Sequence, residues 1–151
     1  MKSTPEPGEL RERALGLLAR REHSRAELAR KLEGAGFVVG DIQLLLDEFE
    51  QKNWLSDRRF AESYVADHRA RAGSVKLAYE LRQRGVSGDV IEAVLGDNRD
   101  SELERACDVW GRKFGTPPAD AAEKAKQIRF MQSRGFTPEV IRRAIDGSDD
   151  Y

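Results

Sequence analysis

The chain has 151 residues, of which 39 % are apolar and 35 % charged, with 26 basic and 27 acidic side chains. This charged share is high for a compact globule, where about a quarter is usual, so it favours an extended protein with much exposed surface. The near-zero net charge by itself indicates no partner, and a single cysteine, Cys107, excludes an intramolecular disulfide and a cysteine-based zinc cluster.

Apolar residues recur at helical spacing almost throughout, and no convincing strand is found. The first third predicts a helix from Leu10, a second behind the capping box of Ser24 and Glu27, and a third over about 41–52. The middle third predicts helices within 56–72, 75–84 and 87–95, and the last third within 101–114, 121–134 and 137–145. The fold class is therefore expected to be all-α.

Three helix endings recur along the chain. Gly36, Gly85 and Gly135 are spaced 49 and 50 residues apart, and an apolar residue follows each. Glycine accepts the left-handed conformation after a helix, and the apolar residue packs back onto that helix. This period predicts three tandem three-helix repeats in an elongated, curved array, over residues 10–56, 57–98 and 99–147. A disordered tail over 1–9 and a frayed end over 148–151 are expected to flank them.

No pattern for catalysis is found. The sequence lacks a glycine-rich phosphate loop, and nothing brings a nucleophile, a base and an oxyanion site together. His68 is expected at the edge of the core and Cys107 packed on its helix. We therefore expect a non-enzymatic protein with no cofactor and no metal site. A reduced, cytoplasmic setting, no membrane segment and a monomer complete this expectation.

Basic residues cluster in two segments. Residues 58–84 hold seven basic and three acidic side chains, and residues 112–143 hold eight and three. Such clusters suit phosphates or an acidic protein groove, although an ordinary solvated helix face remains an equal alternative. The candidate partner-binding residues are Arg58, Arg69, Arg71, Lys76, Arg82, Arg84, Lys124, Lys126, Arg129 and Arg134.

Five segments of the chain match the motifs of one known family, in the same order and with the same spacing. They are residues 19–32, 55–65, 80–86, 112–115 and 124–135. Together the chain over about 10–145 resembles the RecX regulators of recombination. The resemblance implies three helical repeats that bind the groove of a RecA filament, with inhibition of ATP hydrolysis, strand exchange and filament growth during DNA repair and the SOS response. It also implies direct DNA binding, which we expect to be weak because the net charge is near zero and few phosphates would be contacted. Residues 71–76 depart from the family's Gly-aromatic-Gly-Pro-x-Arg turn, which puts a contact there in doubt.

Three hypotheses follow from the sequence. The first is a regulator of RecA filaments. The second is a helical DNA-binding protein without RecA dependence, because three-helix units can act as helix-turn-helix modules. The third is a helical scaffold for another protein.

Overall fold

The computed structural model describes residues 6–96 and 101–147, and in these ranges it contains nine helices and no strand, which confirms the all-α prediction. The helices are α1 (Pro7–Arg20), α2 (Arg25–Gly34), α3 (Val39–Gln51), α4 (Asp57–His68), α5 (Ser74–Gln83), α6 (Gly88–Gly96), α7 (Glu102–Lys113), α8 (Ala121–Ser133) and α9 (Pro138–Ile145).

The N-terminal boundary differs from the prediction. The helix α1 begins at Pro7, so the tail predicted over 1–9 is wrong for residues 7–9, and 1–5 lie outside the described residues. Proline suits the first turn of a helix because no backbone donor is needed there, and Glu9 interacts favourably with the positive helix end. The C-terminal residues 148–151, predicted to be frayed, also lie outside the described residues.

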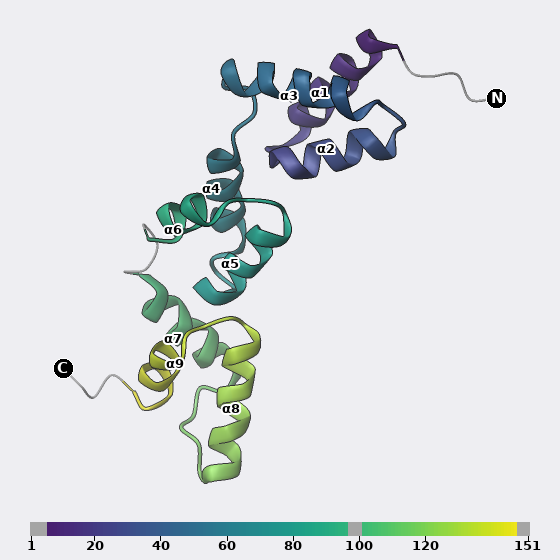
Figure 1. Ribbon diagram of the computed structural model, residues 1–151. Coiled ribbons are helices and arrows are strands. Elements are labelled where there is room, and N and C mark those ends of the chain that lie inside the picture. The colour runs from purple at the N-terminus through teal and green to yellow at the C-terminus, as the bar shows by residue number, and fades with distance from the viewer. Residues whose placement is uncertain (1–5, 97–100, 148–151) are drawn as a thin grey trace.

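The helices form three bundles, α1–α3, α4–α6 and α7–α9, which follow one another along the length of the molecule (Figure 1). Each bundle has its own core, centred on Leu28 and Phe49 in the first, Leu77 and Leu81 in the second, and Met131 in the third. The surface area of 9515 Å² exceeds the value of about 7,700 Å² expected for a compact monomer of this mass. The elongated array of three-helix units is confirmed.

Most of the predicted helix starts are confirmed. Ser24 and Glu27 form the capping box of α2, and the side chains of Ser56 and Thr137 accept hydrogen bonds from the first turns of α4 and α9. Ser101 precedes α7, but its side chain makes no cap hydrogen bond to that helix. Its hydroxyl instead accepts a hydrogen bond from Arg69 of the preceding bundle, at 3.0 Å.

None of the helices in the described ranges combines the length and the apolar character that a membrane crossing requires.

Candidate partner-binding surface

The first junction joins the bundle α1–α3 to the bundle α4–α6. The Ser24 hydroxyl donates a hydrogen bond to the Arg84 carbonyl oxygen at 2.6 Å, and the first N–H of α2 donates to the Asp57 carboxylate at 2.7 Å. Gly85 has φ +83°, and a Cβ atom there would lie 2.3 Å from the Ala26 Cβ. The turn after α5 therefore lies directly against the start of α2, and only glycine fits it.

The second junction joins α4–α6 to α7–α9 by the same arrangement. The N–H groups of Gly73 and Val75 donate to the carbonyl oxygens of Arg134 and Gly135, at 2.8 and 2.9 Å. Gly135 has φ +87°, and a Cβ atom there would lie 2.1 Å from the Lys76 Cβ. The turn after α8 therefore lies against the start of α5, as the turn after α5 lies against α2.

Side chains of α7 strengthen the second junction. The buried Glu102 carboxylate accepts a hydrogen bond from the first N–H of α5, at Ser74, over 2.8 Å. The Arg105 guanidinium donates to the Arg69 carbonyl oxygen at 2.9 Å. A carboxylate at a helix N-terminus also interacts favourably with the helix dipole. These bonds fix the direction in which the third bundle follows the second.

A hollow of about 250 Å³ lies at the first junction, and its cations have partners. Arg21 pairs with Glu27 at 2.7 Å, and the Arg84 guanidinium lies 4.6 Å from the centre of the Tyr64 ring. Burial, together with a hydrogen bond to Glu80, raises the pKa of Tyr64 to about 12. The residues that line this hollow are Arg21, Glu22, Glu27, Phe60, Ser63, Tyr64, Asp67, His68 and Arg84.

A second hollow, of about 260 Å³, occupies the corresponding place at the second junction. Its walls hold four basic side chains and no carboxylate. Two of them lie over the Phe130 ring, with Arg134 Cζ at 5.2 Å and Lys113 Nζ at 5.3 Å from its centre. The residues that line this hollow, named here the basic hollow, are Ala70, Arg71, Val109, Arg112, Lys113, Phe130 and Arg134.

Three of the ten predicted contact residues serve the junctions. Arg69 donates to Ser101 across the second junction, and the Arg84 carbonyl oxygen accepts from Ser24 across the first junction at 2.6 Å. The backbone of Lys76 lies against Gly135. Arg84 follows the end of α5 as its C-cap. Residues 71–76, which differ from the turn motif of the family, therefore form part of the second junction.

The other predicted residues are more accessible. Arg58 pairs with Glu62 at 3.0 Å and Lys124 with Asp146 at 3.3 Å, and such exposed pairs are weak. Four of the ten predicted residues are exposed and make no side-chain hydrogen bond or ion pair with other described residues: Arg71, Arg82, Lys126 and Arg129. The structure brings Arg71 and Arg134 together in the basic hollow, whereas Arg58 and Arg82 lie on other helices of the second bundle.

Arg112 and Lys113 complete the basic hollow, although they are not among the ten predicted contact residues. Their adjacency in a basic segment was the available signal. Their approach to Arg71 depends on how the second and third bundles pack, which no local pattern in the sequence reveals.

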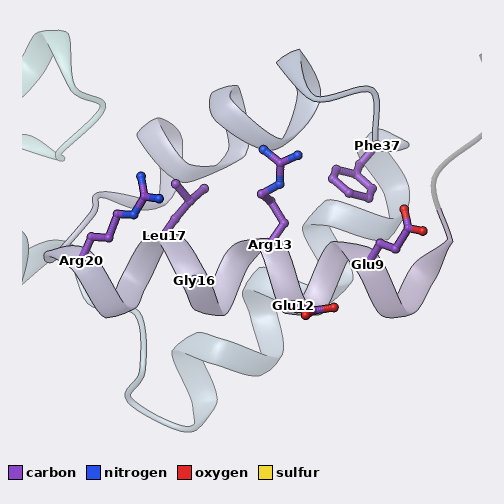
Figure 2. A pocket seen from close by; sticks show the side chains of 7 residues that line it. All are labelled: Glu9, Glu12, Arg13, Gly16, Leu17, Arg20 and Phe37. Carbon is purple, nitrogen blue, oxygen red and sulfur yellow. The ribbon is translucent and has the colours of Figure 1, made fainter.

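A larger groove of about 650 Å³ lies on the first bundle (Figure 2). Figure 2 shows Arg13, Leu17 and Arg20 along one side of α1, with Phe37 on the same side near the Glu9 end of the helix. Glu9 and Glu12 also line it, so its charge is mixed. The groove therefore favours neither an anion nor a cation.

The titratable residues noted in the sequence lie apart from any catalytic arrangement. His68 is half-buried and stacks on Tyr64 with ring centres 4.0 Å apart, as expected for the edge of the core.

The expectation that Cys107 is packed is wrong, because it lies on the exposed face of α7. Its sulfur is only partly buried, but this burial and then the charge of Asp108 raise the pKa of the thiol, which disfavours the reactive thiolate. The described ranges hold no group of three histidine, cysteine or acidic side chains suited to a metal ion.

Comparison with known proteins agrees with this architecture along the whole array. Models of the RecX family match the chain three times: the first three-helix domain over residues 11–49, the second over 56–95 and the third over 100–145. The chain belongs to the RecX family. The regulatory protein RecX of Ralstonia nicotianae is 49 % identical over 144 residues, covering 95 % of this chain and 91 % of that protein. The regulatory protein RecX of Chromobacterium violaceum is 44 % identical over 141 residues, covering 93 % and 91 %.

The fold of the family is also found in solved structures. The crystal structure of RecX from Lactobacillus salivarius superposes with a TM-score of 0.82, covering 96 % of this chain and 97 % of that one at 18 % identity. A second crystal structure of a regulatory protein RecX gives a TM-score of 0.79 over 93 % of this chain and 72 % of that one. The three-bundle array is thus shared by distant members of the family.

Proposed function

We propose that the chain is a non-enzymatic, cytoplasmic regulator of recombination and DNA repair that binds along the groove of a RecA filament. Bound there, it inhibits ATP hydrolysis, strand exchange and filament growth. The observation that carries the proposal is the match of all three bundles to RecX domains, in order and over most of the chain. Relatives at 40–49 % identity are themselves named regulatory proteins.

The form of the molecule supports a steric mechanism. Tandem units in an elongated array offer a long surface to a macromolecule, and the junction hydrogen bonds resist bending between units. An array that contacts adjacent filament subunits would oppose the movements that accompany ATP turnover. It would also occupy the path of an incoming duplex. A monomer without a cofactor suffices for this role.

The contact surface is proposed on the second and third bundles. On α5, Val75, Tyr79 and Arg82 are exposed at positions i, i+4 and i+7, so they share one face of the helix. On α8, Lys126 and Arg129 are exposed and lie three residues apart. An exposed tyrosine beside a cation is typical of interface anchors, since tyrosine and arginine are enriched there. Apolar contact would also make filament binding less sensitive to salt than binding by charge alone.

Co-sedimentation tests the proposal against the DNA-binding alternative. The cognate RecA filament, formed on single-stranded DNA with a non-hydrolysable ATP analogue, is expected to carry the protein into the pellet at salt concentrations that release it from bare DNA. Equal retention by the bare DNA and by the filament at every salt concentration would instead support a DNA-binding protein without RecA dependence. Retention by neither would leave the helical scaffold hypothesis.

A further inference from the structure

The two junction hollows have the same position in the array but opposite chemistry. In the hollow at the first junction, Glu22, Glu27 and Asp67 offset the cations. In the basic hollow, four cations converge from three segments of the chain without a carboxylate among the lining residues. Like charges held close together repel, so this arrangement is less stable without a bound anion. The contrast points to a ligand at the second junction only.

The hydrogen-bonding groups that line the basic hollow indicate which class of ligand can bind there. Every polar side chain that lines the basic hollow is an arginine or lysine, which donates hydrogen bonds and accepts none. An acidic peptide would bring backbone N–H donors that need acceptors when buried. A DNA backbone presents acceptors only, in its phosphate and sugar oxygens. The donor-only lining therefore fits a DNA strand better than a polypeptide.

The apolar residues and the guanidinium groups that line the basic hollow also suit a DNA strand. Ala70, Val109 and Phe130 provide apolar surface suited to a deoxyribose. The Arg134 Cζ atom lies 5.2 Å from the centre of the Phe130 ring, and an arginine guanidinium plane is also a surface on which nucleic-acid bases stack. Arginine also matches phosphate geometry through two parallel hydrogen bonds. We propose that the basic hollow binds the phosphodiester backbone of a DNA strand, with Arg71, Arg112, Lys113 and Arg134 around the phosphate.

This site extends the proposed function and does not depend on RecA. Arg112 and Lys113 are exposed and make no hydrogen bond across either junction, so their substitution tests the hollow without breaking the array. Arg142 and Arg143 provide a matched control, because they are exposed, lie on α9 in the same bundle and do not line the hollow. Both double substitutions to glutamine change the net charge equally.

The experiment measures binding of a fluorescein-labelled 20-nucleotide oligo(dT) by polarisation, in the absence of RecA, over a series of salt concentrations. R112Q/K113Q is expected to bind roughly tenfold more weakly, with a salt slope reduced by about 0.7 to 1.4. R142Q/R143Q is expected to bind within about threefold of wild type with its slope unchanged. The charge-conserving R112K/K113R is expected to restore most of the affinity. Circular dichroism confirms that each variant is folded.

Two results would overturn the site. Equal losses in R112Q/K113Q and R142Q/R143Q would show that only overall charge attracts DNA. Competition by poly-L-aspartate as effective as that by unlabelled oligo(dT), at matched charge, would show a site for acidic polypeptides. Because RecA is absent from these measurements, either failure leaves the proposed regulation of RecA filaments untouched, and the co-sedimentation test judges that proposal separately.

Discussion

Gly135 lies so close to Lys76 that a Cβ atom at Gly135 would stand 2.1 Å from the Lys76 Cβ. Real carbon atoms do not approach so closely, so the second junction requires glycine for two independent reasons: its positive φ and this contact. Gly85 repeats the relationship with Ala26 at the first junction. In the second and third bundles, the glycine that follows the middle helix is therefore also in direct contact with the preceding bundle.

Gly135→Ala is expected to destabilise the protein more than Gly36→Ala. Gly36 shares the positive φ, at 95°, but it is exposed at the first bundle, where the left-handed conformation alone costs about 1–2 kcal/mol. At position 135 the clash with Lys76 adds about 1–3 kcal/mol. Urea unfolding of both variants measures the difference. Equal losses of stability would mean that the second junction relaxes freely.

The sequence predicted the left-handed conformation of these glycines, but it did not predict their close contacts with the preceding bundle. Helix periods, caps and the spacing of Gly36, Gly85 and Gly135 are local signals, so the nine helices and their tandem order could be predicted from them. The contact between Gly135 and Lys76 joins residues far apart in the chain and follows only from packing. For the same reason the sequence did not predict that the Arg84 carbonyl and the start of α5 at Lys76 lie at the junctions, or that cations converge in the basic hollow.

Glu102→Ala is expected to weaken the second junction by about 2–3 kcal/mol, because it leaves the Ser74 N–H without its acceptor. Glu102→Gln keeps an acceptor oxygen of similar size, so it is expected to cost less than about 1 kcal/mol. Denaturant unfolding of the two variants checks the ranking. If glutamine and alanine are equally destabilising, the hydrogen bond to Ser74 contributes nothing.

Stability is expected to fall at mildly acidic pH because of His23. Burial lowers the pKa of this imidazole below 6.5, and its Nε2 accepts a hydrogen bond from Lys31 at 2.9 Å while Nδ1 donates to the Arg21 carbonyl oxygen at 3.1 Å. The folded state thus favours the neutral ring, whereas the unfolded chain takes up a proton near pH 6.5. The stabilisation is complete above that pH and is lost as pH falls toward the lower folded-state value.

Unfolding free energies at pH 7.5 and 5.5 measure this loss, and each unit of difference between the two pKa values is worth about 1.4 kcal/mol. His23→Asn is expected to be less stable at both pH values but to lose less on acidification. A variant whose stability falls as steeply as that of the wild type would assign the effect to other groups.

K126E/R129E is expected to weaken binding to the RecA filament by about tenfold while changing stability by less than about 0.5 kcal/mol, because both side chains are exposed and unpaired among the described residues. R13E/R20E is a control with the same change in charge, because both arginines are exposed and lie in the groove of the first bundle, away from α8. Filament affinity measured by co-sedimentation distinguishes them. Similar losses in the two variants would place no special contact on α8.

The most direct test of regulation is the DNA-dependent ATPase of the cognate RecA, measured as this protein is added. The proposed restraint of the filament predicts that the rate falls at substoichiometric to stoichiometric amounts, because each bound array opposes the movement of the subunits that it contacts. A rate that stays unchanged at several-fold molar excess over RecA would contradict it.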